Sequence, residues 1–372
     1  MRIFTLALAL VCCLPIQQDA NAKKNKFRAE IKTRGIINCF PKGLMRKKKK
    51  KPVTCETSAV LFDGKQVFFG SDKRITGKKR SAVFTMPYTK KGLQTNARRY
   101  QLPFKKGKKY EDFTISPDRK YGFAITGFDR IKKRKRSWDK YNRFFYWKIG
   151  SKDIRMFPSS RWDKTTRTIP LRRRISRVLR NKEFPYGVPY YKIEGLAAIP
   201  GNRLLFGIRE WGAKYYAFQY SVKIVSMSYT VSPEGLKIND DAKVIYDFST
   251  RAVKKLRKRV ALSSLEYNPA DGYLYMLTSY ETSSTAKGLG AYLWRIKLRH
   301  VHRNKAAKIA KQPDGEYLLF AHKAEGMTFL DPHTLLVIHD DDRVFGQKPV
   351  KDLRTEFYRE RHQAAYTIVH IK

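Results

Sequence analysis

Five segments of the chain share one pattern, in which two short apolar runs flank a polar turn. The clearest copy lies at 325–343, where apolar residues alternate through Met327–Phe329 and then run through Leu335–Ile338. The residues Asp331–His333 supply the turn between these runs. Apolar runs of strand length on either side of a turn predict an antiparallel hairpin.

Related hairpins recur upstream at 194–210, 111–125 and 263–277, and a weaker copy lies at 59–69. The copies begin at intervals of roughly 50 to 85 residues, which is typical of radially repeated units. We therefore predict an all-β fold, a single β-propeller of about five or six blades with basic insertions between blades. A further strand expected at 364–371 would complete the blade begun by the N-terminus.

Acidic residues recur at equivalent positions of these hairpins. A glutamate precedes the first strand at Glu111, Glu194 and Glu325, whereas the fourth copy has Ser263 there. Because the first strand of each propeller blade lines the central channel, these side chains should converge around one axis. The ends of the second strands add charged residues to the same mouth: Asp129, Arg209, Glu210, Glu281, Asp340, Asp341 and Asp342.

Clustered carboxylates repel one another unless cations lie between them, and two arrangements are consistent with the sequence. In one, a calcium ion takes its oxygen ligands, about 6 to 8 in number, from this mouth. Its candidate ligands are Glu111, Glu194, Glu325, Asp340, Asp341 and Asp342, and Arg209 and Arg343 would then contact a phosphate. In the other, Arg209 and Arg343 neutralise the acidic ring through ion pairs.

The charge of the chain adds a second kind of candidate partner. The 372 residues include 79 Lys and Arg against 32 Asp and Glu, a net charge of +47. An excess of this size repels itself, so we expect part of it to meet an anionic small molecule or a polyanion. An apolar fraction of 42% argues against disorder of the whole chain. The candidate polyanion contacts lie in four basic segments: Arg46, Lys47, Lys48, Lys49, Lys50, Lys51; Lys132, Lys133, Arg134, Lys135, Arg136; Arg172, Arg173, Arg174; and Lys254, Lys255, Arg257, Lys258, Arg259.

Two of these basic segments permit more than one interpretation. The segment 132–136 leads into the aromatic run Phe144–Trp147, and such a combination can bind single-stranded nucleic acid through phosphate contacts and stacking. A basic loop entering an aromatic propeller strand explains it equally. The segment 171–180 predicts a helix with Leu171, Ile175, Val178 and Leu179 on one face. That helix either packs on its own domain or makes a peripheral contact with an anionic membrane.

The N-terminus has the pattern of a cleaved signal peptide. Residues 1–22 combine a basic start, an apolar run and the Ala20–Ala22 cleavage pattern, which leaves a propeller domain at 23–372. The apolar run of about 14 residues is shorter than the roughly 20 that span a membrane, although an uncleaved anchor is the alternative. We expect no transmembrane span after cleavage and a secreted or periplasmic location. Cleavage leaves Cys39 and Cys55, which we predict to form one disulfide.

Common catalytic motifs are missing from the sequence, which has no G-x-S-x-G elbow, Walker loop, H-E-x-x-H or C-x-x-C. The hairpins instead resemble the phytase-like β-propeller domain family, also called the esterase-like activity of phytase family. Ile193–Ala197 with Leu204–Arg209 carries the likeness, as does Glu325–Met327 with Leu335–Arg343. The resemblance implies an exported, calcium-compatible propeller, with phosphoester hydrolysis proposed for some members.

Two functions are therefore consistent with the sequence. The first is a phytase-like, calcium-dependent phosphoesterase, or a degenerate relative, acting on an anionic phosphorylated substrate. The second is a non-catalytic envelope protein whose basic surface binds lipopolysaccharide, a cell-wall polymer or nucleic acid.

Overall fold

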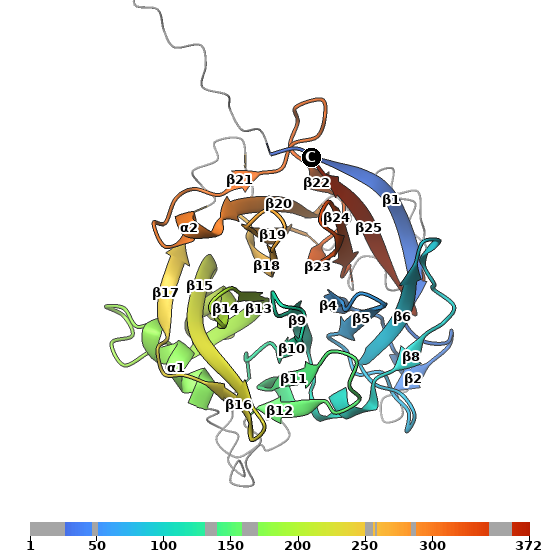
Figure 1. Cartoon of the computed structure of the whole chain (residues 1–372), viewed down its shortest axis with the longest axis horizontal. Coiled ribbons are helices and arrows are strands. Elements are labelled where there is room, and N and C mark those ends of the chain that lie inside the picture. The colour runs from blue at the N-terminus through green and yellow to red at the C-terminus, as the bar shows by residue number, and fades with distance from the viewer. Residues whose placement is uncertain are drawn as a thin grey trace, which may run out of the picture.

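The structure is a computed structural model of the chain, and it describes residues 27–46, 51–130, 140–157, 170–249, 256, 259–283, 288–341 and 359–372. Five antiparallel sheets are arranged in a ring around a central axis, which makes the protein a single five-bladed β-propeller (Figure 1). The fold predicted from the repeated hairpins is confirmed. The predicted signal peptide lies outside the described residues.

Each blade is built from consecutive strands, the first of which is innermost. The first blade contains β4 (Thr57–Phe62), β5 (Gln66–Ser71), β6 (Val83–Thr89), β7 (Gly92–Leu93) and β8 (Arg99–Tyr100); the second contains β9 (Tyr110–Ile115), β10 (Tyr121–Thr126), β11 (Phe144–Lys148) and β12 (Arg155–Phe157). The third contains β13 (Tyr190–Ile199), β14 (Arg203–Lys214), β15 (Ala217–Ser232), β16 (Gly235–Ile238) and β17 (Lys243–Asp247). The fourth contains β18 (Ala261–Asn268), β19 (Tyr273–Glu281), β20 (Leu289–Lys297), β21 (Lys308–Ile309) and β22 (Leu319–Phe320).

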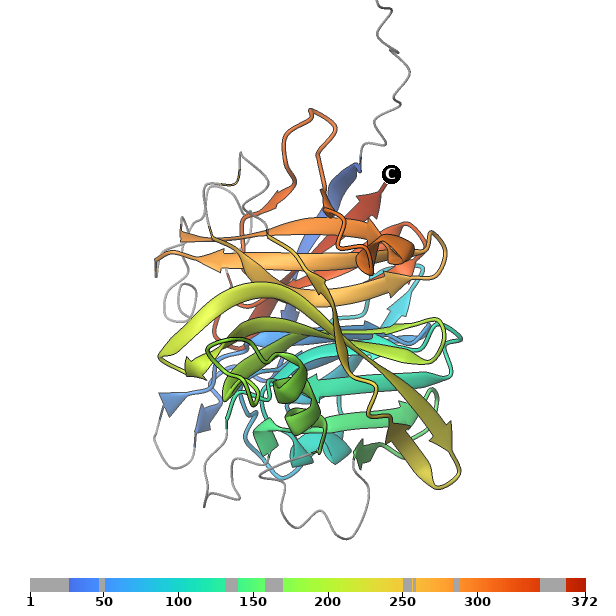
Figure 2. The ribbon, with the colours of Figure 1, turned by 90° about the vertical axis from the view of Figure 1, so that its left-hand side faces the viewer.

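The fifth blade joins the two ends of the chain. It contains β23 (Ala324–Asp331), β24 (Thr334–His339), β25 (Gln363–Ile371) and, on its outer edge, the N-terminal strand β1 (Ala29–Asn38). β1 pairs antiparallel with β25, and the two strands lie side by side in Figure 2. Strands from both ends of the chain thus complete one blade and close the ring, as the sequence predicts.

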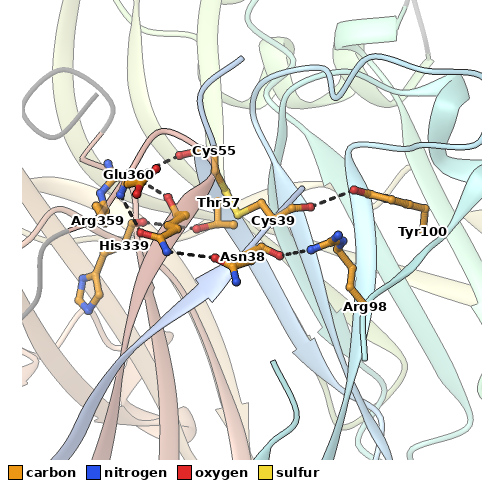
Figure 3. Close-up of a disulfide and its surroundings, with 10 residues drawn as sticks. Asn38, Cys39, Cys55, Thr57, Arg98, Tyr100, His339, Arg359 and Glu360 are labelled. Carbon is orange, nitrogen blue, oxygen red and sulfur yellow. Dashed lines mark hydrogen bonds between the residues drawn. A yellow bond between two sulfur atoms is a disulfide. The ribbon is translucent and has the colours of Figure 1, made fainter. Parts of the chain in front are cut away.

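The predicted disulfide between Cys39 and Cys55 lies beside this closure (Figure 3). It connects the end of β1 to the segment before β4, and it spans the β2 (Met45–Arg46) and β3 (Lys51–Pro52) hairpin. Both cysteine N–H groups donate to carbonyls of the segment that precedes β25. The bond therefore holds three chain segments together at the seam, and its presence fits an oxidising compartment.

The hydrophobic core lies between neighbouring blades. The aromatic run Phe144–Trp147 is buried in β11, so it forms a propeller strand and not an exposed stacking surface. The predicted helix is α1 (Pro170–Val178), at the periphery of the ring (Figure 1). Its residues Leu171 and Ile175 are buried between the second and third blades, so the helix packs on its own domain.

Two short helices complete the described structure, the 3-10 helix η1 (Leu102–Lys106) and α2 (Leu298–Val301). Within the described ranges, no helix is long and apolar enough to cross a membrane.

Candidate functional site

The repeated position that the sequence places before each first strand lies inside that strand, where it forms a β-bulge. In β13, Ile193 pairs with Ile208 and the next pair is Gly195 with Gly207, which leaves Glu194 as an extra residue. The other innermost strands have the same irregularity at Ser58, Glu111, Ser263 and Glu325. A bulge redirects its extra side chain away from the regular alternation of the strand. The bulges thus place the three glutamates at one end of the channel.

A lysine stands two residues before each of these glutamates. Lys109 Nζ lies 3.1 Å from Glu111 Oε1, and Lys323 Nζ lies 2.5 Å from Glu325 Oε1. Lys192 forms an ion pair with Glu194, and its Nζ is also 3.5 Å from Glu111 Oε1. The motif Lys-x-Glu recurs in the sequence at 109–111, 192–194 and 323–325, and it is the local signal that would have indicated lysine partners for these glutamates.

Arg209 connects the third and fourth blades. Its Nη1 lies 3.0 Å from Glu194 Oε2 and donates to the hydroxyls of Ser263 and Ser279, at 2.9 and 3.0 Å. It also donates to the carbonyl of Leu262. The fourth blade has Ser263 where the second, third and fifth blades have glutamate, and Arg209 supplies the polar contacts there. Arg209 is thus engaged by the protein and is poorly placed to bind a phosphate.

The second strands contribute further buried acids. Lys109 donates to Asp129 over 2.8 Å, and the hydroxyl of Tyr190 donates to Glu210 over 2.5 Å. Glu281 is half-buried at the end of β19. The mouth of the channel is therefore lined by alternating cations and carboxylates, which we call the ion-pair ring.

The fifth blade adds an aspartate–histidine pair to the ring. Asp341 Oδ2 lies 2.5 Å from His322 Nδ1, and its Oδ1 accepts the N–H of Lys323 over 2.9 Å. Arg359 approaches the same carboxylate, at 3.9 Å. Asp340 is buried beside it, whereas Asp342 and Arg343 lie outside the described residues.

Burial and the neighbouring charges act in opposite directions on these acids. Burial raises the pKa of Glu111 to about 8, against the opposing charges of Lys109 and Lys192. Burial also disfavours the charged form of Glu325, but Lys323 and the other nearby cations outweigh it and hold its pKa below the ordinary value. The ring therefore contains carboxyl groups with different affinities for protons.

Asp112 of β9 cross-links neighbouring blades, a role that the hairpin pattern of the sequence does not indicate. Its Oδ2 accepts the N–H groups of Leu196 and Leu265, over 2.7 and 3.1 Å. The hydroxyl of Ser264 donates to both of its oxygens, over 3.2 Å. One carboxyl group thus joins the innermost strands of the second, third and fourth blades.

The calcium hypothesis can be tested against the donor set of the ring. The glutamates at the bulges each face the ammonium group of a lysine, which occupies the space that a cation would need. Among the described residues, no three Asp, Glu, His or Cys side chains are grouped so that they could hold a metal ion. The described residues do not fit calcium. The acids pair instead with cations, as in the other arrangement, but the partners are Lys109, Lys192 and Lys323 together with the predicted Arg209, and Arg343 lies outside the described residues.

The basic segments are placed unevenly. The side chains of Arg46 and Lys51 lie on the β2–β3 hairpin, and Arg173 and Arg259 are exposed. The other candidate residues of the first, second and fourth basic segments lie outside the described residues: Lys47, Lys48, Lys49, Lys50, Lys132, Lys133, Arg134, Lys135, Arg136, Lys254, Lys255, Arg257 and Lys258.

Two arginines of α1 have structural roles in place of the predicted surface contact. Arg172 is buried, with its guanidinium 4.3 Å from the ring centroid of Tyr191, and it donates to the carbonyl of Pro189. Arg174 donates to the carbonyl of Ile238 over 2.6 Å and forms an ion pair with Asp240. Both residues therefore fasten α1 to the third blade, and Arg173 alone of the three points to solvent.

The fold and the ring define a five-bladed propeller with a buried network of charges at one mouth. No family model matches the chain, and no curated protein matches it. Among solved structures it is similar to the PQQ-bound aldose sugar dehydrogenase of Streptomyces coelicolor, at 11% identity over 83% of this chain and 76% of that one, with a TM-score of 0.36. A DUF4221 family member from Bacteroides vulgatus has 9% identity over 94% and 99% of the two chains, with a TM-score of 0.39.

A luciferin-regenerating enzyme is similar at 10% identity over 85% of this chain and 92% of that one, with a TM-score of 0.36. These neighbours are β-propeller-like proteins, several of them enzymes, and at such identities the likeness carries no functional inference. The resemblance to phytase-like proteins is thus supported at the level of the propeller fold only.

Proposed function

We propose that this protein is a non-catalytic propeller that binds a polyanion through its outer surface. The observation that carries the proposal is the distribution of charge between interior and surface. In the described part of the chain, ten acidic side chains are buried, against four Lys and Arg. The buried acids are Glu56, Glu111, Asp112, Asp129, Glu194, Glu210, Glu266, Glu325, Asp340 and Asp341.

Burying acids in the channel makes the surface more cationic than the composition alone suggests. The chain has 79 Lys and Arg and 32 Asp and Glu, and setting aside the ten acids and four cations that are buried in the described part leaves 75 cations against 22 acids. A surface of this kind attracts polyanions without needing a shaped pocket. Lipopolysaccharide, an anionic cell-wall polymer and nucleic acid are the partner classes that this chemistry fits.

The proposal predicts a steep dependence of binding on salt. Affinity of the full chain for heparin, lipopolysaccharide and an oligonucleotide should be measured between 50 and 200 mM NaCl. A protein that makes about 6 to 10 phosphate contacts loses roughly 10³- to 10⁵-fold in affinity over this range. Binding that is absent for every polyanion, or that does not change with salt, would overturn the proposal.

A second candidate function rests on the His322–Asp341 pair. Asp341 Oδ2 lies 2.5 Å from His322 Nδ1, and a carboxylate in this position orients an imidazole in the way that acid–base chemistry by a histidine requires. Lys323 follows His322 directly and provides a cation at the same mouth. This combination supports a phosphoesterase whose base is His322, acting on an anionic phosphorylated substrate.

Phosphate release distinguishes this candidate from the first. Hydrolysis of phytate or p-nitrophenyl phosphate, with and without added calcium, should be compared between the native chain and the variants Asp341→Ala and His322→Gln. Turnover that disappears in both variants, while salt-sensitive retention on heparin persists, favours the enzyme. Turnover that is absent from the native chain leaves polyanion binding as the proposed function.

A further inference from the structure

The longest hairpin of the propeller extends beyond the channel mouth and ends in tyrosines. β14 and β15 continue past Arg209 and Glu210 of the ion-pair ring, and their turn is formed by Tyr215 and Tyr216. With Phe218, these two tyrosines belong to a group of aromatic rings that also includes Tyr190 and Tyr220. We call these five residues the tip cluster.

The tip cluster exposes aromatic rings to an unusual degree for this protein. Tyr216 is 87% exposed, Tyr215 is 53% exposed and Tyr220 is 38% exposed. The ring centroids of Tyr215 and Tyr216 are 5.1 Å apart with an interplanar angle of 78°, and those of Phe218 and Tyr220 are 5.4 Å apart at 71°. Since Tyr215 and Tyr216 meet edge to face and are the most exposed rings of the cluster, they can present ring faces to a flat ligand.

The base of the hairpin is held in place by the ion-pair ring. The hydroxyl of Tyr190 donates to Glu210, and the guanidinium of Arg209 lies 5.4 Å from the ring centroid of Tyr220. At Gly212 the two strands approach so closely that a Cβ atom would lie 2.4 Å from the carbonyl oxygen of Ala217. These contacts position the tip cluster relative to the mouth, so less conformational entropy is lost when a ligand binds.

Past Glu210 the hairpin itself carries cations and no acids, and the exposed Asp247 of β17 forms an ion pair with its Lys223. The sequence from Trp211 to Pro233 contains no Asp or Glu. Lys214 is exposed next to the turn, and the guanidinium of the exposed Arg259 lies 5.9 Å from the ring centroid of Tyr220. Lys223 lies over the ring of Trp211 at 5.4 Å. Aromatic faces and cations are therefore interleaved on one projecting element.

We propose that the tip cluster is a stacking platform for single-stranded nucleic acid, a proposal that deepens the polyanion-binding function and rests on it. Successive bases stack on exposed aromatic rings while the phosphates between them contact Lys and Arg, without preference for sequence. Duplex nucleic acid keeps its bases stacked inside and cannot use the rings. A membrane surface fits less well, because Ala213 and Ala217 are the only aliphatic residues at the tip and neither provides a large apolar group.

Stacking can be separated from charge by a probe that has phosphates but no bases. Affinities of the full chain for labelled dT20 and for an abasic 20-mer of equal charge should be measured at the same salt concentration. We expect the native chain to bind dT20 more tightly, by roughly 5-fold or more for each stacked base. The Tyr215→Ala/Tyr216→Ala variant should bind both probes with similar affinity and keep the native salt slope, because its phosphate contacts are intact.

Tyr186, 95% exposed on the loop between α1 and β13, provides the matched control. The Tyr186→Ala variant removes an exposed ring outside the tip cluster and should retain the preference for dT20. Equal binding of dT20 and the abasic probe by the native chain, or a preference that survives the double variant, overturns the platform while leaving polyanion binding intact. Loss of binding to a uronate polymer but not to dT20 in the double variant would assign the platform to an anionic glycan instead. The absence of binding to either oligonucleotide rejects the proposed function itself.

Discussion

The pair formed by Lys323 and Glu325 offers the most direct test of the ion-pair ring. Their charged atoms are 2.5 Å apart, and the side chains are 15% and 5% exposed. Removing one partner of a buried pair leaves the other charge uncompensated, which costs about 3 to 5 kcal/mol. Because Arg209 and Lys192 also act on Glu325, we expect Lys323→Met to cost about 3 kcal/mol, at the lower end of this range.

A double-mutant cycle isolates the interaction between the two residues. Replacing both with methionine removes the buried charges together, and such replacements by apolar groups are often close to neutral. The double variant should therefore be more stable than Lys323→Met alone, with a coupling free energy of about 2 kcal/mol. Unfolding of the four proteins in urea gives these free energies, provided that the slope with denaturant is the same for all.

The pH dependence of the free energy of unfolding tests the same ion pair independently. The folded-state pKa of Glu325 lies below its ordinary value of 4.5, so the pair stabilises the fold above that pH and loses this contribution as the pH falls through the folded pKa. The destabilisation by Lys323→Met should therefore be largest near neutral pH and should shrink in acid. Additive effects of the two substitutions, together with a penalty that does not vary with pH, would refute the reasoning.

Three further predictions follow from single sites. Because the Cys39–Cys55 bond closes a loop with a sequence separation of 16, its reduction should cost about 3 kcal/mol, and equal urea midpoints for the reduced and oxidised chains would contradict this. Burial raises the pKa of Glu266 to about 8, so the contribution of this group to stability is complete below 4.5 and is lost as the pH rises through about 8. Between these pH values the free energy of unfolding of Glu266→Gln should therefore rise, relative to that of the native chain, by up to about 1.4 kcal/mol per pH unit. Unfolding of both proteins at pH 5 and pH 8 measures this difference. Arg172→Met should lower the free energy of unfolding by roughly 1 to 3 kcal/mol without changing heparin affinity. Substitution of the exposed neighbour, Arg173→Met, should change the free energy of unfolding by less than about 0.5 kcal/mol. If Arg173 contacts the polyanion, this variant should also reduce the slope of log affinity against log salt concentration by about 1.

The repeat of the hairpins could be read from the sequence because it is local. Alternating apolar residues around the turn at Asp331–His333 specify a hairpin through interactions between near neighbours, and the same holds for the other copies. The helix at α1 was predictable for the same reason, since Leu171 and Ile175 recur at helical spacing. The disulfide followed from the number of cysteines left after the expected cleavage.

The identity of the partners in the mouth was not predictable in this way. Whether Glu194 meets a metal ion or an ammonium group depends on which side chains the other blades bring to it, and Lys192 and Arg209 reach it through the bulge and the neighbouring strand. Arg172 has the sequence context of a surface arginine, yet the packing of α1 buries it on Tyr191. Both outcomes depend on distances between residues that are remote along the chain.

The sequence by itself determined that this protein is a propeller with acids at the repeated strand entries and an excess of cations elsewhere. Local periodicity and composition are enough for those statements. Only the tertiary structure decided that the acids are neutralised by lysines, that Asp112 joins three blades and that the aromatic residues of the β14–β15 hairpin gather beside the mouth. Those features arise from the closure of five blades around one axis, which fixes long-range distances that no local pattern encodes.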